Sequence, residues 1–356
     1  MVNYRLAEEK DYESINAFYN KMYSASRTIE QFYWEFHNGP FGAAIYVVAM
    51  DNDKIVGTNC VIPIDLMTYD NKTIRSGKSE DTLVDPAYRG QKIFYGIYEY
   101  LFEKCTEAGI EVIWGFTSAK KPFKKLGFTV PYDHQQSLQV SNVGESYRFL
   151  STLNVKNKAV DKIKILGLCL MSKMKGLGVT SKKQKEYEVR INEKVSNDRV
   201  NELIYSSFSK EDNSFAINQN PTFQEWRIYN NPNFHRVHTY SVYNQKSELM
   251  GLIVFNSHKN KVAYVCQTTF HKKVTEQAIS SVLKEATQDL FSKGIVLIRN
   301  WHFDINEFNR SEIDVFKTSG YTHLEKGIGM VWKELGDAKI DAKGFHLSRI
   351  ATQGVL

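Results

Sequence analysis

The sequence predicts a mixed α/β fold built from two similar domains in tandem. Three observations lead to this prediction. The chain has 356 residues, about the length of two domains at roughly 100–200 residues each. Short motifs recur in the same order in its two halves. Each half also begins with strand-like segments and continues with helices that alternate with apolar strands, a pattern typical of a mixed sheet rather than a purely parallel one.

Composition places the chain among ordinary globular proteins, with 42% hydrophobic and 24% charged residues. A net charge of +6 is too small to indicate a nucleic-acid-binding protein. The four cysteines form no CxxC pair, which argues against a zinc ribbon and favours a reducing compartment. The first residues lack the apolar core of a signal peptide, and the longest apolar stretch, Ile163–Met171, is too short to span a membrane. We therefore expect a cytoplasmic protein.

The clearest repeated motif is WxxxNxP, which occurs at Trp34–Pro40 and again 192 residues later at Trp226–Pro232. A second match pairs Phe123–Phe128 with Phe316–Tyr321, 193 residues apart. Three further matches keep the same order, at separations between 185 and 194. Together they predict two copies of one domain. We expect the first copy at 1–145, a linker at 146–185, the second copy at 186–336 and a C-terminal tail at 337–356.

The linker holds most of the positive charge. It carries ten Lys or Arg and one acid, a net +9, which leaves −3 for the rest of the chain. Apolar residues are interleaved with its lysines. This pattern fits a basic amphipathic helix that contacts an anionic membrane surface through residues 156–185. It fits equally a helix that docks its apolar side on the two domains and leaves its lysines in solvent.

Periodicity predicts the elements of the first copy. They are, in order, strands at Ala44–Met50, Lys54–Met67 and Thr73–Asp85, a long helix at Gly90–Glu107, a strand at Ile110–Phe116 and a short helix at Lys120–Leu126. β-Branched residues such as Val47 and Val48 favour the first strands. Apolar residues at 3–4 spacing indicate the long helix, and Gly109 stops it. The second copy has its long helix at Thr275–Phe291, and we expect each copy to end on its own pair of strands.

The most informative segment lies between a strand end and a helix start. The strand ends at Asp85, and Arg89-Gly90 opens the long helix after a short turn. Exposed amides and the positive end of the dipole at a helix start form an anion site. Gly90 permits close backbone approach, while Arg89 and Lys92 add charge suited to a pyrophosphate. The same residues also fit an ordinary turn with solvated cations.

The order of these elements, with V-D-P-x-Y-R-G before the helix and F-K-K-L-G-F at the later helix end, resembles the GNAT superfamily of N-acetyltransferases. The resemblance covers Asn3 to about Asn142, and a degenerate second copy covers about Tyr187 to Trp332. It implies acetyl-CoA as the acyl donor. The strand that pairs with its pantetheine arm would be Thr82, Leu83 and Val84. The loop that holds its pyrophosphate would be Arg89, Gly90, Gln91, Lys92, Ile93 and Phe94.

The chain departs from the family pattern at three positions. Lys92 and Phe94 stand where the loop usually has Gly and Gly or Ala. The charge of Lys92 can compensate, whereas the ring of Phe94 must point away from the cofactor. Phe123 stands where a Tyr often protonates the leaving thiolate, so no proton donor is assigned. The second copy reads T-T-F-H-K-K-V from Thr268, without Arg-Gly, and we expect it to bind no cofactor.

Acetyl transfer to an amine needs a proton acceptor and a donor that meets the thioester oxygen. Glu80 and Asp81 precede the strand implied to bind the cofactor, and strand alternation places them on opposite faces. Thr82 shares the face of Glu80 by the same rule, which favours Glu80 as the acceptor. A backbone N–H at Leu83 or Val84 would meet the oxygen. The alternative is that both acids are merely solvated at a strand end.

The sequence thus predicts an acetyl-CoA-dependent N-acetyltransferase acting on a primary amine of a small molecule. Analogy with similar two-copy chains suggests an amino sugar of cell-surface polysaccharide synthesis. One alternative is a catalytically silent binding protein of the same fold. The other is a peptidoglycan-bridge aminoacyltransferase, against which Arg89-Gly90 argues because such enzymes need no pyrophosphate loop. We expect no metal site, since no HExxH motif occurs and the spacing of His235 and His238 points their rings apart on a strand.

Overall fold

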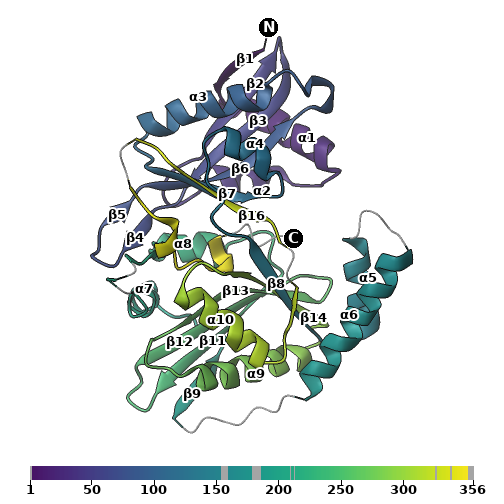
Figure 1. Ribbon diagram of the computed structural model, residues 1–356, viewed down its shortest axis with the longest axis vertical. Coiled ribbons are helices and arrows are strands. Elements are labelled where there is room, and N and C mark those ends of the chain that lie inside the picture. Colours follow the sequence, from purple (N-terminus) through teal and green to yellow (C-terminus); the bar gives the residue numbers. More distant parts are fainter. Residues whose placement is uncertain are drawn as a thin grey trace.

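The computed structural model describes residues 2–153, 159–178, 186–208, 210–211, 213–324, 327–336 and 339–351. Two large mixed sheets lie one above the other (Figure 1). The strands of the first sheet are, in spatial order, β1 (Asn3–Leu6), β2 (Ile45–Asp51), β3 (Lys54–Pro63), β6 (Ser76–Val84), β7 (Val112–Thr117) and β16 (Gly329–Glu334). Those of the second are β15 (Thr322–Leu324), β8 (His134–Val140), β14 (Leu297–Phe303), β13 (Val262–Phe270), β12 (Leu249–Ser257), β11 (Arg236–Asn244) and β9 (Tyr187–Ile191). A small third sheet joins β10 (Phe215–Ile217), β4 (Leu66–Thr68) and β5 (Thr73–Ile74).

Helices cover these sheets. In the first half they are α1 (Tyr12–Tyr23), α2 (Ile29–Phe36), α3 (Ile93–Glu107), α4 (Lys120–Lys125) and α5 (Val143–Thr152). The others are α6 (Ala159–Leu177), α7 (Asn197–Tyr205), α8 (Pro221–Gln224), α9 (Glu276–Ser292) and α10 (Glu307–Thr318). In the described part of the chain, no helix is both long and apolar enough to cross a bilayer.

The two sheets exchange one strand each. Strand β8, from the first half of the sequence, pairs with β14 in the second sheet, and β16, from the second half, pairs with β7 in the first. Both pairings are antiparallel over six or more residues. The expectation that each copy ends on its own pair of strands is therefore wrong. Each sheet takes one strand from the other of the two predicted ranges, 1–145 and 186–336.

The repeated WxxxNxP motifs meet at the centre of the molecule. The indole N–H of Trp34 donates to the carbonyl of Trp226 at 2.8 Å, and that of Trp226 donates to the carbonyl of Trp34 at 2.6 Å. Their ring centroids lie 5.6 Å apart. This reciprocal contact is what a duplicated domain produces when the two copies pack through the same surface.

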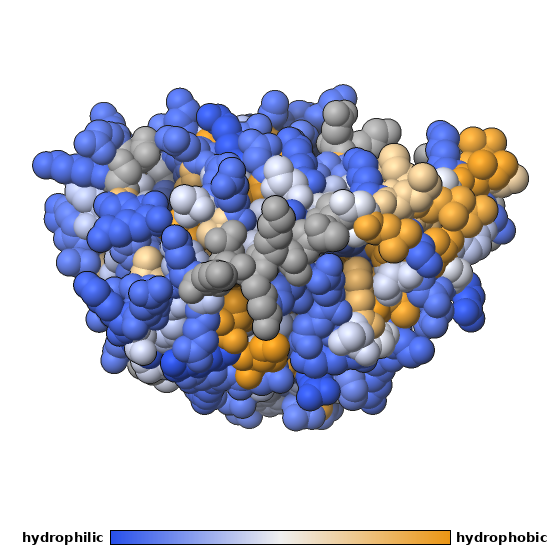
Figure 2. All heavy atoms as spheres, turned by 90° about the horizontal axis from the view of Figure 1, so that it is seen from below, coloured by the Kyte–Doolittle hydropathy of each residue, from blue (hydrophilic) through white to orange (hydrophobic). Residues whose placement is uncertain are grey.

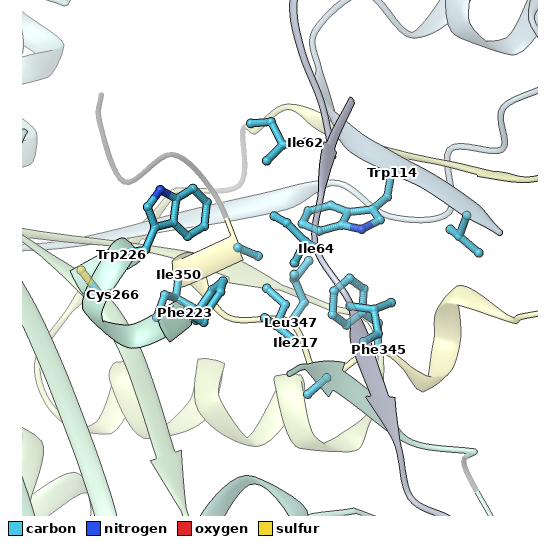
Figure 3. Packing of buried hydrophobic residues seen from close by; sticks show 14 of the residues in the cluster. Ile62, Ile64, Trp114, Ile217, Phe223, Trp226, Cys266, Phe345, Leu347 and Ile350 are labelled. Atoms are coloured by element: carbon cyan, nitrogen blue, oxygen red, sulfur yellow. The ribbon is translucent and has the colours of Figure 1, made fainter. Parts of the chain in front are cut away.

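The largest apolar cluster lies between the two sheets and joins both halves of the chain (Figure 3). It includes Trp114 from β7 and Phe223 from α8. Phe345 and Leu347, from the segment predicted as a C-terminal tail, are at most 1% exposed and belong to the same cluster. The predicted tail is therefore part of the core as far as residue 351.

Most predicted elements of the first copy are found within a few residues of their expected bounds. The two long predicted strands are each broken, into β3 and β4 and into β5 and β6. The long helix starts at Ile93 rather than Gly90, because Gly90 and Lys92 have positive φ values of 85° and 62°, which no α-helix accommodates. In the second copy, α9 covers Glu276–Ser292 as expected.

The described part of the predicted linker is mostly helical, as both interpretations of this segment expected. Helices α5 and α6 pack on each other and on β8. Residues 154–158 and 179–185, which include half of the linker's cations, lie outside the described residues. One face of α6 docks on the second sheet, as one of the two interpretations of this segment expected.

Candidate functional site

The predicted site is built around a β-bulge in β6. Thr58 of β3 pairs with Leu83, and Cys60 pairs with Glu80, so a single residue of β3 faces both Asp81 and Thr82. Asp81 has φ of 50°, in the left-handed region that Asp tolerates better than most residues. Such a bulge bends its strand and redirects the side chains that follow it.

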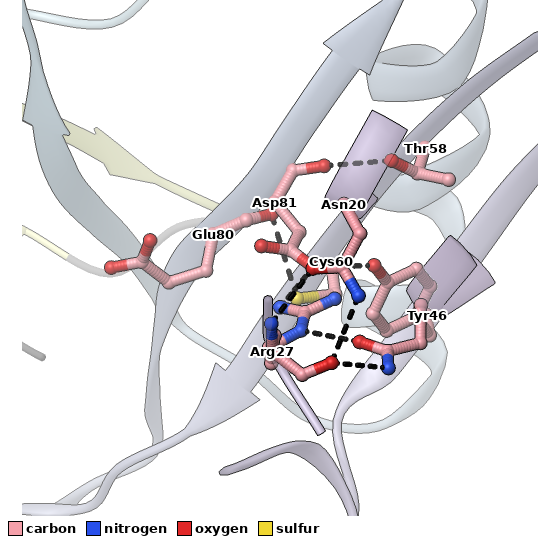
Figure 4. Close-up of polar contacts among 8 residues, drawn as sticks. Asn20, Arg27, Tyr46, Thr58, Cys60, Glu80 and Asp81 are labelled. Atoms are coloured by element: carbon pink, nitrogen blue, oxygen red, sulfur yellow. Dashed lines mark hydrogen bonds and ion pairs between the residues drawn. The ribbon is translucent and has the colours of Figure 1, made fainter. Parts of the chain in front are cut away.

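The bulge overturns the expected alternation of side chains. Ser79 and Thr82 both bond to the phenol of Tyr98, at 2.9 and 3.0 Å, so these two share the face covered by α3. Glu80 and Asp81 make their contacts with other partners (Figure 4). Thr82 therefore does not share the face of Glu80, and that argument for preferring Glu80 was wrong.

Asp81 is occupied by structural partners. Its carboxylate accepts from Arg27 at 2.8 Å and from the Tyr46 hydroxyl at 2.9 Å, and its carbonyl accepts from Thr58 (Figure 4). The side chains of Asp81 and Arg27 are only 3% and 9% exposed. Burial raises the pKa of Asp81, while the Arg27 guanidinium opposes that shift. A buried carboxylate whose Oδ2 already accepts two hydrogen bonds is better suited to fixing the bulge than to receiving a substrate proton.

Glu80 has a freer side chain and a different partner. It is 21% exposed and forms an ion pair with Lys78, which is itself buried. Burial lowers the pKa of Lys78, and the charge of Glu80 opposes this. Nearby lies Glu35 of α2, whose Oε1 has no hydrogen-bond partner among the described residues. Burial first, and then the charges of Glu80 and Asp81, raise the pKa of Glu35 to about 7.

Strands β6 and β7 pair in parallel only from Ser76 to Lys78 and then separate. A cavity of about 800 Å³ opens between them. Seven of the eleven predicted site residues line it: Glu80, Asp81, Thr82, Leu83, Val84, Arg89 and Phe94. Ile328 and Val331, next to and within β16, line the same cavity, so the second half of the chain contributes to its wall.

The remaining four predicted residues, Gly90, Gln91, Lys92 and Ile93, form the loop and the start of α3 beside this cavity. The side chain of Ile93 is 2% exposed and packs in the core, so only its backbone can serve a ligand. Gly90 has φ of 85°, which supports the need for glycine there.

The start of α3 carries unsatisfied donors. The amides of Gly90, Lys92, Ile93 and Phe94 donate to no backbone acceptor among the described residues, and no side chain caps the helix. With Arg89 on the cavity wall, these amides and the positive end of the helix dipole form an anion cradle. Such an arrangement can bind a phosphate-like anion.

One of the two predicted oxygen-binding amides faces the cavity side of β6. The amide of Asp85 donates to Val56 of β3, and strand residues alternate in direction. The N–H of Leu83 therefore points towards β3, whereas that of Val84 points to the edge left open by β7. Val84 is thus the donor of the two that a bound acyl group can reach.

Two aromatic residues form part of the cavity wall. The ring of Phe94 packs 5.0 Å from Tyr98 and 5.6 Å from Phe123, measured between centroids. Both Phe94 and Phe123 nevertheless border the cavity, so the expectation that Phe94 turns away from the cofactor space is only partly met. Position 123 is Phe in this chain, so it offers no hydroxyl where the family often has a Tyr.

The second copy has an equivalent cleft with different chemistry. Strands β13 and β14 also pair in parallel over only three residues, and a cleft of about 540 Å³ lies by the start of α9. Three of its lining side chains are carboxylates: Glu276, Glu307 and Glu312. Thr275 caps α9 by accepting from the amide of Ala278. A capped helix start with acidic neighbours disfavours a pyrophosphate.

Sequence reasoning missed the partners that fix the acids. Lys78 could have been found, because period-two spacing places it on the face of Glu80. Arg27 and Tyr46 lie 54 and 35 residues before Asp81, and no local pattern links them to it. Among the described residues, no cluster of His, Cys, Asp and Glu could hold a metal ion.

Residues 3–130 match the family described as acetyltransferase (GNAT) domain. This match covers most of the first copy and agrees with the resemblance that its motifs indicated. No curated protein matches the chain.

Solved structures extend the likeness to nearly the whole chain. A probable N-acyltransferase from Enterococcus faecalis is 8% identical, with a TM-score of 0.63 over 94% of this chain and 72% of that one. A GCN5-related N-acetyltransferase from Anabaena variabilis is 9% identical, with a TM-score of 0.62 over 94% of this chain and 73% of that one. A tandem GNAT protein from the clavulanic acid biosynthesis pathway is 12% identical, with a TM-score of 0.59 over 95% and 100%. At such identities the likeness concerns the fold, and it confirms the predicted mixed α/β architecture with two GNAT-like units.

Proposed function

We propose that the chain is an acetyl-CoA-dependent N-acetyltransferase whose single cofactor site lies in the first copy. The observation that carries this proposal is the anion cradle at the start of α3, next to the cavity between β6 and β7. A pyrophosphate on the cradle would leave the pantetheine arm to run along the open edge of β6. The acyl group would then reach the part of the cavity lined by Glu80 and Val84.

In this proposal the chain's residues have three tasks. Glu80 accepts the proton that the attacking amine loses, directly or through water. The amide of Val84 donates to the thioester oxygen as negative charge develops on it while the C–N bond forms and the C–S bond breaks. Asp81 is a positioning residue, because its carboxylate holds the bulge through Arg27 and Tyr46.

The acceptor is a primary amine of a small molecule. Met22 and Tyr23 of α1 line one side of the cavity in which it would bind. An amino sugar of cell-surface polysaccharide synthesis is our preferred acceptor class, by analogy with similar two-copy chains. A cytoplasmic location belongs to the same proposal and agrees with four free, buried thiols.

Release of the CoA thiol with a panel of primary amines, amino sugars included, tests this activity. The four cysteines are buried, so a thiol reagent will report CoA with little background. We expect turnover with at least one amine, a kcat reduced roughly 100–10,000-fold in Glu80→Gln, and a KM for acetyl-CoA raised roughly 10–100-fold in Arg89→Glu.

Lys272→Glu is the matched control for the charge reversal. Lys272 lies by the equivalent helix start of the second copy, and its replacement should leave both constants unchanged. Acetyl-CoA binding without turnover on any amine would favour the silent binding protein instead. Turnover with aminoacyl-tRNA but not with acetyl-CoA would favour the aminoacyltransferase.

A further inference from the structure

Helix α6 (Ala159–Leu177) uses only one face to dock on the protein. Cys169 and Ser172 are fully buried against the second sheet, and the Ser172 hydroxyl donates to the carbonyl of Leu138 at 3.1 Å. Ile165 and Leu168 pack on the same apolar cluster. These four residues fall on one side of the helix, at 100° per residue.

The opposite face is apolar and open to solvent. Figure 2 shows hydrophobic atoms gathered at the right-hand edge of the molecule, where Figure 1 places α5 and α6. The exposed side chains on α6 are Val160 (60%), Ile163 (72%), Leu166 (42%), Leu170 (48%), Met171 (45%), Met174 (72%) and Leu177 (75%). They make up seven of the twelve large hydrophobic side chains exposed in the described part of the chain, so this is a patch and not ordinary scatter.

Lysines border this apolar stripe on both sides. At 100° per residue, Lys162 and Lys173 fall along one edge, and Lys164 and Lys175 fall along the other. Asp161 is the only acidic residue in the helix. An exposed apolar stripe between two rows of cations is the pattern of a helix that lies in the plane of an anionic membrane interface.

We propose that α6 is a peripheral membrane anchor that binds a bilayer rich in anionic phospholipids. The apolar stripe enters the boundary of the acyl chains, and the four lysines extend their stems to the phosphates beside it. The docked face, with Cys169 and Ser172, fixes the helix rigidly to the second sheet. Membrane binding then needs no change in the fold, and the whole enzyme is held at the surface.

Charge makes a second copy of the chain a poorer occupant of this face. Two such helices packed stripe to stripe would bring the lysine rows of one copy against those of the other. The single acid of α6, Asp161, lies towards the docked side and cannot neutralise them. An anionic lipid surface supplies the missing negative charge along the full length of the helix.

Co-sedimentation with vesicles tests this proposal on the full chain. We expect binding to phosphatidylcholine vesicles containing phosphatidylglycerol, little binding to phosphatidylcholine alone, and weaker binding as salt is raised. Each of Lys162→Gln and Lys164→Gln should lower the partition coefficient roughly fivefold. The double variant Ile163→Glu, Met174→Glu should abolish binding, because both side chains are 72% exposed and can be changed without disturbing the core.

Ile191→Glu, on an exposed position of β9, is the matched control and should bind as the unaltered chain does. Circular dichroism will establish that every variant is folded. Absence of binding to anionic vesicles at low salt would overturn the proposal, as would equal binding by the Ile163→Glu, Met174→Glu variant. The alternative occupant of the stripe is a second copy of the chain, and sedimentation velocity tests it. If the unaltered chain is a dimer and the Ile163→Glu, Met174→Glu variant is a monomer, the stripe is a self-association surface and the membrane proposal is wrong.

Discussion

Asp81 combines a left-handed backbone with a buried ion pair. Its φ of 50° costs conformational energy, and its partner Arg27 also stacks over the ring of Tyr19, 3.8 Å from the ring centroid. The surrounding contacts therefore hold a bulge that the chain would not adopt by itself. This bulge determines which side chains of β6 face the cavity.

Removal of the Asp81 carboxylate should destabilise the fold. We expect Asp81→Ala to lower the free energy of unfolding by about 3–5 kcal/mol, because it leaves the Arg27 guanidinium buried without its charge partner. Asp70→Ala, which breaks the exposed pair with Lys72, should cost less than about 1 kcal/mol. Urea denaturation of both variants measures the difference, and equal effects would contradict the structural role of Asp81.

Glu35 makes stability depend on pH in an unusual direction. Its pKa is raised to about 7 in the folded chain, mainly by burial, from an ordinary value of 4.5. Between these two values the unfolded chain is ionised at this position while the folded chain keeps its proton. A rise in pH therefore favours unfolding across this window, and the penalty is constant above it.

The variant Glu35→Gln removes that dependence. Relative to the variant, the unaltered chain should lose about 3 kcal/mol of stability between pH 4.5 and pH 7. Denaturation curves at several pH values across that window measure the difference. Two curves that stay parallel with pH would show that Glu35 is ionised in the fold.

At the scale of elements, the two long helices explain why only one copy should bind the cofactor. Helix α3 begins without a cap and with free amides, whereas α9 begins with Thr275 as its cap and Glu276 in its first turn. A helix start that already satisfies its own donors has less to offer an anion. In the sequence, the only sign of this difference between the two helix starts is that the first copy has Arg89-Gly90 and the second copy lacks Arg-Gly.

At the same scale, Lys92 is one of the two loop positions at which this chain departs from the family pattern. Its φ of 62° is the conformation that glycine adopts freely, which accounts for glycine being usual there. We expect Lys92→Gly to stabilise the fold by about 1 kcal/mol. Glu99→Gly, in the exposed middle of the same helix, should destabilise it by about 1 kcal/mol. Thermal unfolding measures both, and a loss of stability in Lys92→Gly would contradict the backbone argument.

At the scale of the whole molecule, the two halves depend on each other. The strand exchange places β16 beside β7 and β8 beside β14, and the largest core cluster joins both halves. Separating the sequence at its repeat boundary would leave both sheets with an unpaired edge and would expose this cluster to solvent.

A fragment of residues 1–145 should therefore fail to fold alone. Followed by far-UV circular dichroism, the fragment should show no cooperative thermal transition. The full chain should unfold in a single cooperative transition. A folded fragment 1–145 that also binds acetyl-CoA would contradict the interdependence of the halves.

Sequence reasoning predicted the tandem architecture and the strand, turn and helix around Arg89, because both follow from local patterns. The repeated WxxxNxP motif begins at Trp34 and again at Trp226, and it can be read from a short stretch of sequence. The same holds for the strand, turn and helix around Arg89. The exchange of β8 and β16 was not predictable in this way, because either strand has the alternation that β7 or β14 requires. The bulge at Asp81 depends on Arg27 and Tyr46, which are distant in sequence.

Calorimetric titration of the full chain with acetyl-CoA tests the central claim most directly. The account predicts one site per chain, lost or weakened at least roughly tenfold in Arg89→Glu and unchanged in Lys272→Glu. Two equivalent sites, no heat of binding, or full affinity in Arg89→Glu would contradict the assignment of the cofactor to the cradle at the start of α3.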